Sequence, residues 1–137
     1  AVAESLVLTW LKMLWHKDRM VTLVAMDSGR IVGYAGLVFG KNRKFKGNAY
    51  LVSVAVSSER RGQGIGSRLF GSIEDYARLR GARRIEFDVF SSNSGAIRLY
   101  ERLGYEREGV KRHAVETPKG FDDLIFMAKF IEVEKGS

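Results

Sequence analysis

Residues 54 to 66 read VAVSSERRGQGIG, and this stretch decides the fold. Val54 to Val56 ends an apolar run that begins at Ala49, which is typical of a buried strand. A polar, glycine-rich loop follows from Ser57 to Gly66, and Gly81 then provides a helix C-terminal signal. Between these points the apolar residues recur every four positions and predict a helix: Ile65, Leu69, Ile73 and Ala77.

The glycine loop has several interpretations. Glycines between a strand and a helix let the backbone approach a ligand, and the first helical N–H groups point outward at the positive end of the dipole. Such a turn can bind a phosphate group, or it can be a tight turn without a ligand. A P-loop is excluded because no Gly-Lys-Ser/Thr follows. A dinucleotide site is disfavoured, although Glu86 and Asp88 lie about 20 residues on, because the spacing is G-x-G-x-G.

Periodicity and glycine turns predict the other elements. Polar residues at helical spacing predict a helix over Ser5 to His16, with apolar residues on its other faces. Ser91 to Ser94 is a helix cap region, and Gly104 ends the helix that follows it. The expected order makes an α+β fold, with a mixed sheet that is antiparallel in its first half and has a parallel crossover in the middle. The strands are expected at Met20–Met26, Ile31–Phe39, Ala49–Val56, Arg84–Phe90, Tyr105–Val115 and Phe121–Glu132.

Composition narrows the function classes. The chain has 137 residues, no cysteine, two histidines and a formal net charge of +7. We therefore expect a single domain over residues 1–137, without disulfides, thiolate chemistry or a metal site, in the cytoplasm. The positive charge suits a phosphorylated ligand, nucleic acid or an anionic membrane. No apolar run is long enough to cross a membrane as a helix, and the basic residues form only one local cluster, Lys41 to Lys46. We expect neither a membrane nor a nucleic acid as partner.

Two motifs resemble the signatures of the GNAT superfamily of acetyl-CoA-dependent N-acetyltransferases. Residues 61–66, RGQGIG, match R/Q-x-x-G-x-G/A, and residues 93–105, NSGAIRLYERLGY, match N-x-x-A-x-x-x-Y-x-x-x-G-F/Y. One predicted helix and one predicted strand separate the motifs, and the pair is more specific than either motif alone. The resemblance implies a mixed central sheet flanked by helices. It also implies direct transfer of an acetyl group from acetyl-CoA to a primary amine, with no metal, by a monomer or homodimer.

The resemblance further implies where acetyl-CoA binds. The pantetheine arm would lie along the end of a strand as an added strand, and the pyrophosphate would lie on the amides that begin the next helix. Asn93 would contact the arm, although a helix N-cap is an equally good role for this residue. The implied cofactor-binding residues are Val54, Ala55, Val56, Arg61, Gly62, Gln63, Gly64, Ile65, Gly66, Ser67, Asn93 and Tyr100.

The implied catalytic residues are Tyr100 and Asp88. Tyr100 takes the position of the family's general acid, and a phenol with a pKa of about 10 is protonated at neutral pH. The alternative for Tyr100 is a core tyrosine on an apolar helix stripe. Asp88 is a candidate general base, directly or through water, where some relatives carry a glutamate. Glu86, on the same face of the predicted strand, His113 and water are the alternatives.

The implied acceptor site is less specific. By position, the family builds this site from Leu11 to His16, Phe39 to Phe45 and Arg112 to Phe121. Asp122 and Asp123 could bind a cationic amine or simply begin the last strand. The acceptor is a protein N-terminus, a lysine or a small amine. The rival hypotheses are an acyl-CoA sensor without turnover and a nucleic-acid-binding module; only charge suggests the module.

Overall fold

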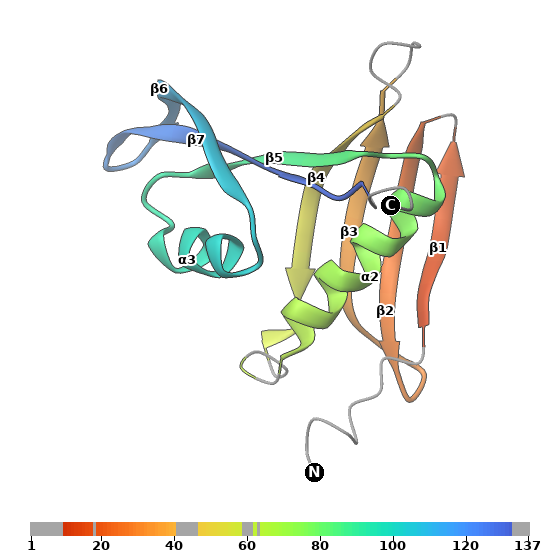
Figure 1. The fold of residues 1–137 in the computed structure, drawn as a ribbon. Helices are drawn as coiled ribbons and strands as arrows, with labels where there is room; N and C mark the ends of the chain where they lie inside the picture. The colour runs from red at the N-terminus through yellow and green to blue at the C-terminus, as the bar shows by residue number, and fades with distance from the viewer. Residues whose placement is uncertain (1–9, 18, 41–46, 59–61, 63, 133–137) are drawn as a thin grey trace.

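In a computed structural model, the described part of the chain forms one seven-stranded mixed sheet with two helices (Figure 1). The structure describes residues 10–17, 19–40, 47–58, 62 and 64–132. The strand order is β1-β2-β3-β4-β5-β7-β6. The elements are β1 (Trp10–Lys17), β2 (Met20–Asp27), β3 (Arg30–Phe39), β4 (Asn48–Val56), α2 (Ile65–Leu79), β5 (Arg84–Phe90), α3 (Ser94–Arg102), β6 (Glu106–Thr117) and β7 (Gly120–Phe130).

The sheet is antiparallel except in its middle, as predicted. β1 to β4 pair as consecutive antiparallel neighbours, and β5, β7 and β6 form a second antiparallel group. The turn between β2 and β3 has positive φ at both central residues, 51° at Ser28 and 79° at Gly29, which matches the twist of a tight hairpin. A parallel pair joins the two groups, because α2 carries the chain from the end of β4 back to the start of β5.

Both helices pack against the same hydrophobic core. The buried stripe of α2 contains Leu69 and Ile73, each with no exposed surface, as the four-residue spacing predicted. Ile85 and Phe87 bring β5 into this core, and Ile97 brings in α3. Because side chains alternate along a strand, the residues of β5 between these core positions lie on the opposite face of the sheet. This alternation determines which side chains are available for chemistry.

The helix predicted over Ser5 to His16 is wrong for the residues that the structure describes. Trp10–Lys17 forms β1, which pairs antiparallel with β2 in a register that joins Trp10 to Met26 and Lys17 to Met20. The segment is apolar on almost every side, and such a run fits a buried strand as well as a buried helix. Pairing with β2 satisfies the backbone groups and overrides the local spacing. Residues 5–9 lie outside the described residues.

Candidate functional site

The two central strands separate after only three paired residues. β4 pairs with β5 from Asn48 to Tyr50, which is opposite Glu86, whereas its other edge pairs with β3 as far as Val56. In Figure 1, β5 leaves β4 and continues beside β7, while β4 runs on alone at that edge. Among the described residues, Leu51 to Val56 therefore has no ladder partner on the β5 side. An unpaired strand edge offers N–H and C=O groups to an extended ligand.

A β-bulge lies in the unpaired part of β4. The register with β3 passes from Leu37–Leu51 to Gly36–Ser53, so Val52 is the extra residue, and about half of its surface is exposed. A Cβ on Gly36 would lie 3.0 Å from a methyl group of Val52 and from Ser53 Oγ, a tight contact that these side chains would have to relieve by shifting. Bulges bend and twist a strand. This one precedes Val54, Ala55 and Val56, which lie half-buried at the predicted strand end.

The glycine turn leads directly into α2, as predicted. Gly62 and Gly64 have φ values of 83° and 78°, and a Cβ on either residue would have no described heavy atom within 4 Å. Gly64 is the N-cap of α2 and supplies no side-chain cap, so this residue leaves the first N–H groups of the helix without a side-chain acceptor. Ser67 is exposed, while the Ile65 side chain is buried in the core. Arg61 and Gln63 lie outside the described residues.

Tyr100 lies on α3, between the start of α2 and the core face of β5. Its ring centroid is 4.7 Å from that of Phe87 and 5.6 Å from that of Phe70. Burial raises the pKa of the Tyr100 phenol, which keeps the hydroxyl protonated. Within the described part of the chain, this hydroxyl makes no hydrogen bond. The ring therefore packs in the core, as one of the two roles considered for Tyr100 requires, and the role of general acid stays a prediction.

Asn93 is the N-cap of α3. Its Oδ1 accepts a hydrogen bond from the backbone N–H of Ala96 at 3.3 Å, which is the structural role considered from the sequence. Contact between Asn93 and a cofactor arm stays a prediction. On the neighbouring helix, Gly66 faces Leu99, and a Cβ on Gly66 would lie 4.0 Å from a methyl group of that leucine. The start of α2 thus lies beside the second half of α3.

Asp88 faces away from Tyr100, on the side of β5 opposite Phe87. The hydroxyl of Tyr50, on β4, donates a hydrogen bond of 2.6 Å to Asp88 Oδ2. Burial and this hydrogen bond raise the pKa of Tyr50 to about 12. The sequence analysis missed Tyr50, because a tyrosine within an apolar strand has no motif. Only the parallel register of β4 and β5, in which Tyr50 lies opposite Glu86, brings it near Asp88.

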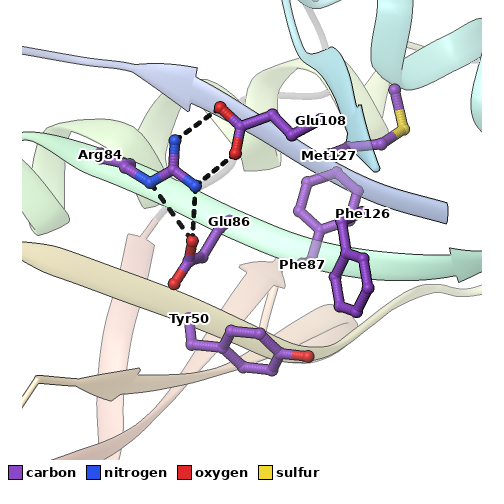
Figure 2. A pocket seen from close by; sticks show the side chains of 7 residues that line it. All are labelled: Tyr50, Arg84, Glu86, Phe87, Glu108, Phe126 and Met127. Atoms are coloured by element: carbon purple, nitrogen blue, oxygen red, sulfur yellow. Dashed lines mark hydrogen bonds and ion pairs between the residues drawn. The ribbon is translucent and has the colours of Figure 1, made fainter. Parts of the chain in front are cut away.

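A hollow of about 150 Å³ opens on this face beside Tyr50 (Figure 2). Arg84 binds two carboxylates at its edge, Glu86 at 2.7 Å and Glu108 through two hydrogen bonds. A second hollow of about 180 Å³ shares Tyr50 and Glu86 with the first, so the two meet at the point where the strands separate. The remaining lining residues are Phe87, Phe126 and Met127 in the first hollow, and Arg19, Val38, Phe39, Gly40 and Asn48 in the second.

The other acceptor-site predictions have mixed outcomes. Leu11–His16 contributes strand and not helix, and residues 41–46 lie outside the described residues. The His113 ring stacks on Phe121 with centroids 5.6 Å apart, and its backbone N–H donates to Asp123. Asp122 accepts hydrogen bonds from the hydroxyls of Ser91 and Ser92. No described contact connects His113 or these aspartates with Asp88.

Comparison with known proteins places this geometry in a family. The model of the acetyltransferase (GNAT) family matches residues 3–105, which is more than half of the chain. The chain therefore belongs to the GNAT acetyltransferase family. The helices and strands named above carry the two signature motifs in the expected order, so the fold and the family match agree.

Particular relatives include enzymes with different acceptors. The ribosomal protein bS18-alanine N-acetyltransferase of Escherichia coli is 35% identical over 80 residues, which make up 58% of this chain and 54% of the relative. The L-methionine sulfoximine/L-methionine sulfone acetyltransferase of Salmonella typhimurium is 33% identical over 100 residues, 69% of this chain and 57% of the relative. The chain thus spans little more than half the length of these curated relatives.

A solved structure supports the fold assignment. The crystal structure of the ribosomal-protein-S18-alanine N-acetyltransferase from Escherichia coli is 27% identical in sequence and has a TM-score of 0.75. The match covers 89% of this chain and 77% of that chain. Within the described part of the chain, neither helix has the length and apolar character needed to cross a membrane.

Proposed function

We propose that this chain is an acetyl-CoA-dependent N-acetyltransferase whose two substrates meet in the opening between β4 and β5. The observation that carries the proposal is the separation of these strands after Tyr50. The glycine turn and Tyr100 lie at this opening on the helix side, and Tyr50 and Asp88 lie on the other face. A donor that enters from one side and an acceptor that enters from the other would bring their reacting atoms together there.

The residues on the helix side fit acetyl-CoA, which supplies an acetyl thioester at the end of a phosphorylated arm. The unpaired edge of Val54 to Val56 would hydrogen-bond the pantetheine arm as an added strand. The N–H groups from Gly62 to Ser67 would bind the pyrophosphate at the start of α2. The open space around Gly62 and Gly64 leaves room for phosphate oxygens. A side chain at Gly64 would project into that space.

The proposed chemistry is a direct transfer. Asp88 takes a proton from the acceptor ammonium group, directly or through one water, and the free amine attacks the acetyl carbonyl carbon. The new N–C bond forms as the C–S bond breaks, and Tyr100 donates its hydroxyl proton to the departing sulfur. The nitrogen then loses its second proton, which returns through water to the Tyr100 phenolate, and Asp88 releases the first proton to solvent. The N–H of Val56 stabilises the negative charge on the carbonyl oxygen. Because burial keeps Tyr100 protonated, the phenol suits the role of general acid.

We further propose that the acceptor carries an α-amine. The two curated relatives are named for their substrates, the alanine of ribosomal protein bS18 and L-methionine sulfone, which are an amino-acid residue and a free amino acid. An α-amine has a pKa of about 8, so a useful fraction is neutral at pH 7, whereas a lysine amine with a pKa of about 10 is almost fully charged. An aspartate is a weak base, which also favours the less basic amine. The cytoplasmic location expected from the sequence stays a prediction.

The binding test compares two glycines that have similar backbone geometry. Acetyl-CoA at 100 times its Kd should stabilise the native state by about 2.7 kcal/mol, whereas acetyl-pantetheine, which lacks the CoA phosphates, should raise Tm far less. Gly64→Asp places a carboxylate in the proposed phosphate site and should abolish the acetyl-CoA shift. Gly29→Asp is the control, because Gly29 has a φ of 79° in a turn between β2 and β3 and also has open space around it. An unchanged shift in Gly64→Asp contradicts the phosphate site.

Turnover separates the enzyme from the rival sensor. Release of free CoA should be measured with an alanine-initiated peptide, with the same peptide acetylated at its N-terminus and containing a lysine, and with L-methionine sulfone. We expect release with the first and third acceptors and little release with the second. If the protein binds acetyl-CoA but releases no free CoA in the presence of any of the three acceptors, the result would favour the sensor.

A further inference from the structure

The hydrogen bond between Tyr50 and Asp88 crosses the point where the two central strands separate. In the parallel register Tyr50 is opposite Glu86, and this is the last pair of the ladder. The Tyr50 hydroxyl nevertheless reaches Asp88, two residues farther along β5, at 2.6 Å. The tyrosine therefore spans from the paired part of the sheet to the edge of the opening. A contact at this place can fix the direction in which the Asp88 carboxylate points.

Asp88 receives this hydrogen bond without a cationic partner among the described residues. The charged groups on the same face are Arg84 and Glu86 on β5, Glu108 on β6, and Arg19, whose guanidinium donates to the Phe39 carbonyl. The residue opposite Asp88 on β7 is the uncharged Phe126. Arg84 is engaged by both glutamates. Asp88 Oδ2 accepts from Tyr50, and within the described part of the chain Asp88 Oδ1 has no hydrogen-bond partner. One oxygen is thus held and the other is available.

We propose that Tyr50 is a positioning residue that holds Asp88 Oδ2, so that Oδ1 faces the acceptor amine; this inference rests on the proposed function. A hydrogen bond donated to a carboxylate favours its charged form, which is the form that can accept a proton. It also fixes the carboxylate within reach of the opening. Oδ1 then accepts one proton from the ammonium group, which leaves a neutral amine and a carboxylic acid.

Tyr50 can donate this hydrogen bond throughout the pH range in which the acceptor titrates. Burial and Asp88 raise the pKa of Tyr50 to about 12, whereas an α-amine titrates near pH 8. The tyrosine itself therefore does not gain or lose a proton during turnover at neutral pH. Its effect passes through Asp88, which separates this role from that of a general acid such as Tyr100.

The test compares Tyr50→Phe with Tyr34→Phe. Tyr34 lies on the neighbouring strand β3 and is about half exposed, so its hydroxyl serves as the matched control. A hydrogen bond to a charged group contributes about 1.5 to 3 kcal/mol, so we expect kcat in Tyr50→Phe to fall about tenfold or more. The acidic limb of the kcat profile should move to higher pH, because the carboxylate loses a hydrogen-bond donor, and the KM for acetyl-CoA should stay unchanged. Tyr34→Phe should leave both rate and profile unchanged.

A double-mutant cycle and a spectrum complete the test. In an Asp88→Asn background, Tyr50→Phe should cause little further loss of kcat. The ¹³Cζ resonance of Tyr50 should move upfield in Asp88→Asn at pH 7, and this readout needs no activity. A pH profile unchanged by Tyr50→Phe, or additive effects in the cycle, overturns the positioning role. If no amine is acetylated, the proposed function fails, and an unmoved resonance would then overturn the Tyr50–Asp88 contact as well.

Discussion

Two tyrosine–carboxylate pairs lie on opposite faces of the same sheet. On the helix face, the Tyr105 hydroxyl donates to Glu74 at 3.0 Å, and both residues are buried. On the opposite face, called the open face because the two hollows lie on it, the Tyr50 hydroxyl donates to Asp88 at 2.6 Å. The pairs share the same chemistry of donor and acceptor, so their surroundings must determine what each one does.

The surroundings differ in charge compensation. Glu74 also accepts two hydrogen bonds from Lys129 Nζ, at 3.0 and 3.2 Å, and the same ammonium group donates to the carbonyl of Leu103. A neutralised network of this kind joins α2 to β7 and to the end of α3. Asp88 has no such cation among the described residues. The two carboxylates thus differ in charge compensation. We expect the uncompensated Asp88, and not Glu74, to be the carboxylate that can take part in proton transfer.

The largest expected effect tests whether the helix face is only structural. Tyr100 lies on that face, yet we expect Tyr100→Phe to lower kcat by roughly 10²- to 10⁴-fold, because it removes the proposed general acid and keeps the packed ring. Steady-state kinetics and thermal unfolding measure the two consequences, and Tm should change little. Tyr105→Phe is the matched control, because it removes the hydroxyl of a structural tyrosine on the same face. This variant should have a lower Tm and a nearly unchanged kcat. Parental turnover in Tyr100→Phe would leave Tyr100 with a packing role alone.

A smaller effect is expected when the compensated pair loses its cation. Among the residues that the structure describes, Lys129→Met leaves the buried Glu74 carboxylate with one hydrogen bond, from Tyr105, and with Arg78 at 3.8 Å. We expect the free energy of unfolding to fall by about 2 kcal/mol, because hydrogen bonds to a charged group are lost. Urea unfolding measures this change, with Lys119→Met at an exposed turn as control. Lost activity with unchanged stability would contradict the structural role of this network.

The smallest effect concerns the ion pair at the edge of the open face. Hydrogen bonds from Arg84, and then its charge, lower the pKa of Glu108. A lowered pKa in the folded state means that the stabilisation is present above the pKa of the unfolded chain, about 4.3, and is lost as pH falls through the folded value. Because Glu108 is 39% exposed, Glu108→Gln should cost less than about 1 kcal/mol at pH 7. Urea unfolding of both proteins at pH 7 and pH 3 should show the difference shrinking at acid pH; a larger difference at pH 3 would contradict this assignment.

Local signals predicted most of the fold. The four-residue apolar spacing gave the stripe of α2, and Gly81 lies just beyond the helix with a φ of 89°. Asn93 caps α3 as its residue type suggests. These features depend on residues close in the sequence, where propensity and capping act. The strand β1 was missed because its place in the sheet depends on pairing with β2 and not on its own pattern.

The site was predictable in part. Motif positions suggested the glycine turn, Tyr100 and Asp88, whose roles stay predictions. The glycine turn begins α2, Tyr100 packs against Phe87 on the core face of β5, and Asp88 lies on the opposite face. Tyr50 could not be found in this way, because its contact with Asp88 spans 38 residues of sequence and arises only from the parallel register. Glu86, the alternative base, is occupied by Arg84, which lies two residues before it on the same face of β5. Residues that contact each other across a parallel strand pair are distant in sequence, so no local pattern in a single sequence predicts the contact.

The three-residue ladder between β4 and β5 also has a consequence for folding. β1 to β4 are joined by short connections and can form their hairpins early, because little loop-closure entropy opposes local contacts. β5 to β7 form a second group of strands around α3. With so few backbone hydrogen bonds between them, the two groups have the character of separate cooperative units, each able to open locally at its own free-energy cost. The helix α2 connects the two groups of strands, and its buried stripe packs against the core that both groups share.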